Sequence, residues 1–341
     1  MFYNCRKLKN IINDNFHINK IGDMSYTFYN CESLKELNLD KFKGNYVNNM
    51  KYMLSGCKSL VEIELSNFST NNVIDMSFLF ENCSSLLNLN LKNFNTANVN
   101  NMSYMFSGCT SLKTLQISNF KTNKVSSMES MFLNCSSLID VNIVKFNLGN
   151  LSNISYMFSG CKLITNIIFP NFITINLSYI TNLFSECESL KNVNIIKFNT
   201  KEVKCMSGLF KNCKKLQNLV LDNFDTQNVC YGCSSLKNIN LSYFITEYVQ
   251  TMYGMFAYCR SLKYLDLSNF ESTHLHYLDF MFYEYRSLKV LNIKKFKVTK
   301  NDNFNGIFNG SLALKKLICT DNRLRQENSF KTKAMHIEYY D

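Results

Sequence analysis

Thiols are the most regularly placed reactive groups in this sequence of 341 residues, which contains 14 cysteines. One series recurs every 26 residues from Cys5 to Cys213, and the same frame resumes at Cys233 and Cys259. Thiols at a fixed repeat position could form disulfides between neighbouring repeats, bind zinc, or serve as small buried side chains. Neighbouring repeats about 5 Å apart would allow disulfides. We favour reduced, buried thiols, because free cysteine packs as a small hydrophobic residue.

Zinc is the least favoured of these interpretations. The regular series contains no Cys-x-x-Cys pair, and the one close pair, Cys230 and Cys233, has no second pair of ligands nearby. Because Cys205, Cys230 and Cys319 lie outside the series, we expect them to react with alkylating reagents before the buried thiols do.

Histidines and carboxylates show no catalytic arrangement. The sequence has four histidines, and the close pair His274 and His276 could bind a metal ion or could be two surface substitutions. Glu62 and Glu64 would share one face of a strand, but no pair of acids recurs in neighbouring repeats. Glycine-rich phosphate-binding patterns and the G-x-S-x-G pattern are absent from the sequence. We therefore predict that the protein is not an enzyme, and we expect no cofactor, no bound metal and no small-molecule substrate.

The cysteines mark one position of a repeat that fills most of the chain. Aliphatic residues follow three, six and eight positions later, as Leu112, Leu115 and Ile117 follow Cys109. The alternation in this L-x-x-L-x-L pattern is typical of a short strand with one face in a core, and self-similarity at such a period is typical of a solenoid. We predict a single solenoid of about 13 repeats over residues 1–318, followed by a non-repeat C-terminal tail or cap over 319–341.

The rest of the repeat predicts a corner and a return segment. A phenylalanine such as Phe120 stands eleven positions after the cysteine, and a threonine such as Thr122 follows two positions later. We expect the phenylalanine in the core and the threonine hydroxyl on backbone groups that the corner leaves unpaired. The spacing of Met102, Met105 and Phe106 then predicts short helical or 3₁₀ turns on the return face.

One repeat is shorter than the others, because Cys213 and Cys233 are only 20 residues apart. Phe224, Thr226 and Val229 keep the usual frame, which places the deletion in the M-x-x-M-F turn. We therefore predict a notch on the return face near residues 230–232. It could be a small apolar pocket, a hinge, or a deletion closed by packing of the neighbouring repeats.

The order of cysteine, L-x-x-L-x-L, N-F, T, V and M-x-x-M-F, as in MSYMFSGCTSLKTLQISNF, resembles the 26-residue repeat of BspA-like leucine-rich repeat surface proteins, which is also abundant in mycoplasma lipoproteins. The resemblance implies a leucine-rich-repeat-like right-handed coil with one parallel β-sheet. It also implies cell-surface display or secretion, adhesion or partner binding, and no catalytic residues. The sequence shows no signal peptide, anchor or transmembrane segment, which leaves an intracellular location open.

Side chains four, five and seven positions after the cysteine should face solvent along the strands and form a candidate binding surface. Its predicted members are Lys35, Glu36, Asn38, Glu62, Glu64, Asn88, Asn90, Thr114, Gln116, Asp140, Asn142, Asn192, Asn194, Asn238, Asn240, Tyr264 and Asp266.

The leading hypothesis is recognition of a protein or glycan on this surface, with an adhesin-like role. The alternative is a rigid structural spacer or surface-coat element. Binding of nucleic acid or another polyanion ranks third. The net charge of +11 would suit an acidic partner, but no run of five lysines or arginines occurs and most aromatic residues occupy core positions.

Overall fold

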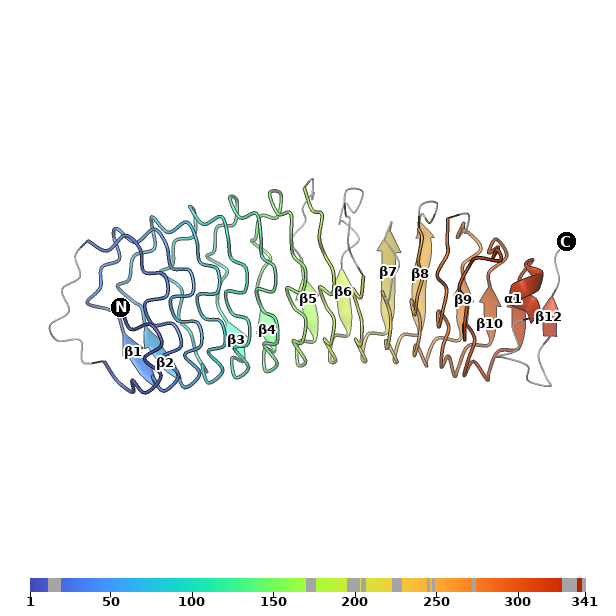
Figure 1. The fold of residues 1–341 in the computed structure, drawn as a ribbon, viewed down its shortest axis with the longest axis horizontal. Coiled ribbons are helices and arrows are strands. Elements are labelled where there is room, and N and C mark those ends of the chain that lie inside the picture. The colour runs from blue at the N-terminus through green and yellow to red at the C-terminus, as the bar shows by residue number, and fades with distance from the viewer. Residues whose placement is uncertain are drawn as a thin grey trace. The chain divides into compact units, whose positions relative to one another are not determined.

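The computed structural model describes residues 1–11, 20–169, 176–194, 203, 207–222, 229–243, 246, 249–271, 274–326 and 336–338. Contacts between residues group the chain into two compact units. Unit 1 comprises Met1–Tyr179 with Lys197–Glu202, and unit 2 comprises Ile180–Ile196 with Val203–Asp341. Within each unit, successive coils are stacked in chain order with the strands along one side (Figure 1). The single domain over residues 1–318 stays a prediction.

Short strands form where the L-x-x-L-x-L pattern predicts them. Unit 1 contains β1 (Glu36–Asn38), β2 (Glu62–Glu64), β3 (Thr114–Leu115), β4 (Asp140–Val141) and β5 (Asn166–Ile168). Unit 2 contains β6 (Asn192–Asn194), β7 (Asn218–Asp222), β8 (Asn238–Tyr243), β9 (Tyr264–Asp266), β10 (Val290–Asn292), β11 (Lys316–Ile318), helix α1 (Asn322–Gln326) and β12 (His336–Glu338). In β1 the buried Leu37 stands between two exposed residues, as the alternation of strand side chains requires.

Neighbouring strands pair in parallel with equivalent repeat positions opposite each other, so that Leu37 faces Ile63 and Leu291 faces Leu317. The predicted class of fold, a parallel repeat solenoid, is therefore confirmed. The strands form several short sheets instead of the one sheet expected: β1 pairs with β2, β3 with β4, β7 with β8, and β9 to β12 form a four-stranded sheet. One interruption lies after β2, where the hydrogen bond from the Leu87 N–H to the Val61 carbonyl is stretched to 3.5 Å.

Among the described residues, the return face consists of tight turns, and the predicted helical or 3₁₀ turns do not form there. Met105 N–H donates to the Met102 carbonyl of its own coil at 3.3 Å, whereas Tyr104 N–H donates to the Glu129 carbonyl of the next coil at 2.8 Å. A type II turn needs a left-handed backbone at its third residue. Tyr104 and Gly108 supply it with φ values of 59° and 73°. Successive type II turns place an inward-facing side chain at every third residue. This is the spacing that suggested a helix in the sequence.

Aromatic columns fill the core beside the aliphatic residues. Phe80, Phe106 and Phe132 are fully buried, and their rings stack in successive coils at centroid distances of 5.7 and 5.6 Å. The predicted phenylalanine position after each strand is also buried wherever the structure describes it, as at Phe42, Phe68, Phe94, Phe120, Phe146, Phe270 and Phe296. Its members Phe16, Phe172, Phe198, Phe224 and Phe244 lie outside the described residues.

Threonine hydroxyls hold the corner after the strands, as predicted. Thr122 Oγ1 accepts the Asn147 N–H at 2.7 Å and donates to the Asn147 carbonyl at 2.8 Å. One hydroxyl therefore satisfies two backbone groups of the next coil. The same pair of bonds joins Thr70 to Asn95, Thr96 to Lys121 and Thr246 to Glu271.

The deletion in the short coil lies earlier than the sequence indicated. The Val229 carbonyl accepts the Phe210 N–H at 2.8 Å, as the Met105 carbonyl accepts the Phe80 N–H at 2.9 Å in a complete coil. Val229 and Cys230 therefore occupy the second methionine and phenylalanine positions of the repeat. The missing residues therefore precede Val229 in the coil. The prediction was wrong because Val229 matched the valine that normally precedes the M-x-x-M-F turn.

The predicted notch is not found at residues 230–232. Cys230 and Gly232 are buried, and their N–H groups donate to the Met255 and Ala257 carbonyls of the next coil at 3.0 and 2.8 Å. On the other side, the Tyr231 carbonyl accepts a bond from the Asn212 N–H at 2.7 Å. These bonds keep the second return turn continuous through the short coil.

Candidate binding surface

The predicted surface residues are solvent-facing in both units wherever their side chains are described. The exposed members are Lys35, Glu36, Asn38, Glu62, Asn88, Asn90, Thr114, Gln116, Asp140, Asn142, Asn192, Asn238, Asn240, Tyr264 and Asp266. Glu64 is half-buried, and the side chain of Asn194 in β6 lies outside the described part. We call the solvent-facing side of the strands in each unit its strand face.

The strand face of unit 1 is acidic at its N-terminal end. Glu36 lies opposite Glu62, and Asn38 lies opposite Glu64, across the parallel pair β1 and β2. The hydroxyl and the backbone N–H of Ser66 both donate to the Glu64 carboxylate. These bonds hold the pKa of Glu64 below its ordinary value. Glu62 and Glu64 thus alternate along β2 as predicted, whereas the position of Glu36 opposite Glu62 was not predicted.

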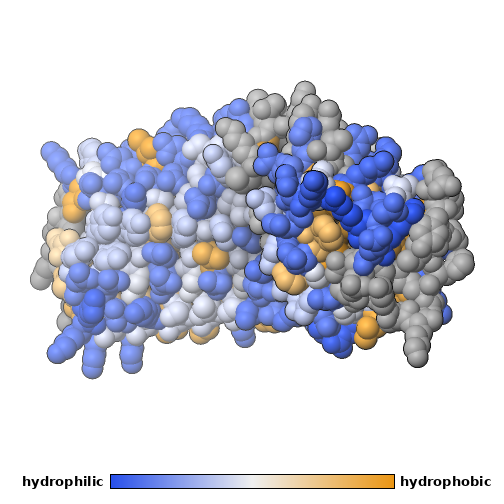
Figure 2. Space-filling model, turned by 45° about the vertical axis from the view of Figure 1, so that its right-hand side comes forward, coloured by the Kyte–Doolittle hydropathy of each residue, from blue (hydrophilic) through white to orange (hydrophobic). Residues whose placement is uncertain are grey.

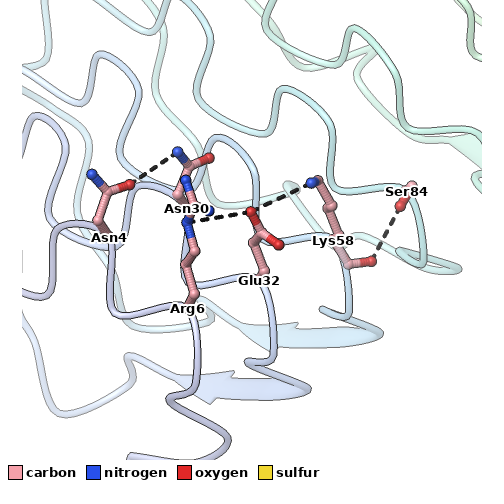
Figure 3. Close-up of polar contacts among 6 residues, drawn as sticks. All are labelled: Asn4, Arg6, Asn30, Glu32, Lys58 and Ser84. Carbon is pink, nitrogen blue, oxygen red and sulfur yellow. Dashed lines mark hydrogen bonds and ion pairs between the residues drawn. The ribbon is translucent and has the colours of Figure 1, made fainter.

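Charged side chains one position after the cysteine compensate one another in the first coils. Glu32 Oε1 lies 3.7 Å from Arg6 Nε and 3.4 Å from Lys58 Nζ, which come from the coils on either side (Figure 3). Asn30 donates to the Asn4 side chain at 3.0 Å along the same edge. Ion pairs in this part of unit 1 thus join neighbouring coils.

Unit 2 carries a row of lysines that the sequence analysis did not recognise. Lys237, Lys263, Lys289 and Lys315 each stand four positions after the cysteine position, and all four are exposed. Lys289 N–H donates to the Lys263 carbonyl at 2.8 Å, and Lys315 N–H donates to the Lys289 carbonyl at 2.9 Å, which fixes these residues on adjacent coils. We call these four residues the lysine row. Aligning the repeats position by position would have revealed it.

Hydrophobic side chains do not form one large patch on the visible surface. Figure 2 shows a mostly hydrophilic face on which hydrophobic residues lie in small separate groups. In unit 1 the position of the lysine row is occupied in part by exposed aliphatic residues, Val61, Leu87 and Ile139. Scattered apolar residues of this kind are ordinary on protein surfaces.

From Cys31 to Cys259 the cysteines of the series form a column of buried thiols within each unit, as predicted, whereas Cys5 is exposed. The Cys109 thiol donates to the Phe80 carbonyl at 3.1 Å, and Ser311 Oγ makes the equivalent bond to Phe282 at 2.8 Å. Burial raises the pKa of Cys109 well above its ordinary value, so little thiolate forms. The described cysteines are all free thiols.

The predicted order of thiol reactivity needs correction. Cys230 and Cys319 are buried, although they lie outside the regular series, and Cys205 lies outside the described residues. The exposed thiol is that of Cys5, in the first coil. The position of a cysteine in the 26-residue series therefore predicts burial from Cys31 onward but does not predict it for Cys5.

His276 contacts an acidic residue of the next coil. His276 Nδ1 lies 3.0 Å from Asp302 Oδ1 of the next coil. Burial alone would raise the pKa of Asp302, but hydrogen bonds from His276 and Thr299 outweigh it, and the pKa lies below its ordinary value. Within the described ranges, no three histidine, cysteine or acidic residues are grouped so that they could hold a metal ion. No helix among those residues has the length and hydrophobicity needed to cross a bilayer.

The stacked coils and the exposed polar strand face define a leucine-rich-repeat-like solenoid. The chain belongs to the family DUF285, described as a mycoplasma protein of unknown function, whose model matches residues 1–115, 58–172, 178–237 and 224–321. The resemblance to BspA-like leucine-rich repeat proteins is thereby confirmed. A comparison with curated proteins gives no match.

A solved structure supports the fold. The chain is similar to a leucine-rich repeat protein from Bacteroides ovatus ATCC 8483, with 21% identity and a TM-score of 0.60 over 99% of this chain and 85% of that one. It is less similar to a leucine rich cell surface protein from Faecalibacterium prausnitzii A2-165, with 18% identity and a TM-score of 0.42 over 91% of this chain and 79% of that one. At this identity the first likeness establishes the fold alone.

Proposed function

We propose that the chain is a non-catalytic binding module that recognises a protein or a glycan on its strand faces. The observation that carries this proposal is the exposure of polar side chains at equivalent positions of successive coils. Such rows recur at about 4.8 Å, the distance between paired strands, and so offer hydrogen-bonding groups at regular intervals. Solenoids commonly use extended surfaces of this kind for binding.

Membership of a mycoplasma repeat family that resembles BspA-like surface proteins supports an adhesin-like role at the cell surface. A rigid spacer is the second candidate. It is favoured by the bonds that join each coil to the next, such as those of Thr122, which would resist bending. We also propose that residues 319–341 cap the C-terminal end, because β12 pairs with β11 and the α1 residue Leu324 is buried.

The binding proposal can be tested by probing the whole chain against an array of glycans and purified extracellular proteins. Any component that binds is then measured with the strand-face variant Thr114→Arg/Gln116→Arg. The matched control, Asn100→Arg/Asn123→Arg, adds the same charge at exposed positions away from the strands. A partner that uses the strand face of unit 1 should lose binding only in the strand-face variant, while both variants keep the wild-type melting temperature. An empty array, or equal loss in both variants, would favour the spacer.

A further inference from the structure

The lysine row of unit 2 is a line of positive charge without neutralising partners. None of its four residues makes an ion pair within the part of the chain that the structure describes, whereas Lys214 and Lys295 of the same unit pair with Glu188 and Glu271. At about 4.8 Å per coil, the backbone positions of the four lysines span about 15 Å. Like charges at this spacing repel one another, so a bound polyanion would relieve the repulsion and release counterions.

The groups facing the row do not cancel its charge. On β9, the carboxylate of Asp266 accepts bonds from the Tyr264 hydroxyl at 3.0 Å and from the Ser268 N–H at 2.9 Å. Arg286 of the same unit pairs with Glu284 at 2.8 Å, and this ion pair has no net charge. Among the described residues, the four lysines therefore outweigh the one negative charge of Asp266.

The surroundings of the row indicate the chemistry of its partner. A shallow depression includes Lys237 and Lys263 together with Asn238, Ser261, Ser287 and Tyr264. Amides and hydroxyls can bond the hydroxyl groups of a sugar, and the Tyr264 side chain, 56% exposed, can pack against a sugar ring. Single-stranded nucleic acid needs aromatic side chains for successive bases. Among the residues that line this depression, Tyr264 is the one aromatic residue.

We propose that the lysine row binds a linear anionic polysaccharide that carries sulfate or carboxylate groups. The inference rests on the proposed function and names the class of partner for one part of the strand face. The polymer lies along the row, its anionic groups contact the ammonium groups, and its hydroxyl groups contact Asn238, Ser261 and Ser287. Lys315 extends the contact beyond the depression.

The test measures binding of the full chain to chondroitin sulfate, with dextran, polyglutamate and an oligo-dT strand as comparison probes. The row variant replaces Lys237, Lys263, Lys289 and Lys315 by Gln. The control variant replaces Lys92, Lys121, Lys124 and Lys145, exposed lysines of unit 1 outside its strand face, by Gln and so removes the same charge. Binding to chondroitin sulfate should weaken at least about tenfold in the row variant and less than about twofold in the control, with a shallower salt dependence in the row variant.

Equal weakening in the two variants would overturn the proposal, because net charge would then explain binding. Tighter binding of polyglutamate or oligo-dT, or no binding of chondroitin sulfate, would also overturn it. A partner found by the array that still binds the row variant would leave the proposed function standing. Unchanged melting temperatures show that a loss of affinity does not come from unfolding.

Discussion

Thr122→Val removes one hydroxyl from the interior of unit 1 while keeping nearly the same side-chain shape. Thr122 is 1% exposed, and its hydroxyl both accepts from and donates to the backbone of Asn147. Valine can do neither. The substitution therefore leaves one N–H and one carbonyl of the next coil without these partners.

The cost follows from the two groups that lose their partner. An unsatisfied buried polar group costs about 1 to 3 kcal/mol, which for two groups sums to about 2 to 6 kcal/mol. The Asn147 residue is exposed, so water can reach part of its backbone. We therefore expect a loss of about 2 to 3 kcal/mol in the free energy of unfolding.

Urea denaturation gives the free energy, and hydrogen exchange gives the location of the effect. The Asn147 amide should exchange much faster in Thr122→Val, because its acceptor is gone. Thr122→Ser is the matched control: it keeps both hydrogen bonds and loses one buried methyl group, worth about 1 kcal/mol. If the valine variant were as stable as the serine variant, or if the Asn147 amide stayed protected, the hydroxyl would not be holding this corner.

Phe120→Ala should cost about 3 to 5 kcal/mol in denaturation because Phe120 is buried, whereas exposed Lys121→Ala should change little; equal small losses would place the phenylalanine outside the core. Brief native alkylation followed by mass spectrometry should label Cys5 first and Cys109 hardly at all, since burial raises the pKa of the Cys109 thiol; rapid labelling of Cys109 would contradict the buried column. The lowered pKa of Asp302 should stabilise the fold above about pH 4, and this stabilisation should be lost as pH falls through the lowered value. Unfolding measured at several pH values should therefore show a smaller acid loss in Asp302→Asn, and an unchanged acid loss would refute this role.

The sequence by itself determined the coil. A period of 26 residues repeats the same inward side chains, and equivalent positions stack because each coil buries its apolar face only against its neighbours. For this reason the strand positions, the buried cysteines and the corner threonine were all predictable from spacing. Thr122 shows the limit of the pattern, since its position was predicted but its two bonds to Asn147 became visible only in the structure.

The tertiary structure was needed wherever one sequence pattern fits more than one local structure. The inward spacing of Met102 and Met105 fits a helix as well as two type II turns, and the hydrogen bond from Tyr104 to the next coil selects the turns. In the short coil, Val229 fits two positions of the repeat, and only its bond to Phe210 shows which one it occupies. Periodicity gives the order of residues along a coil, but hydrogen bonds between coils fix which residues stand side by side. Hydrogen bonds between coils likewise place Lys263, Lys289 and Lys315 on adjacent coils, and so turn lysines that look scattered in the sequence into a row.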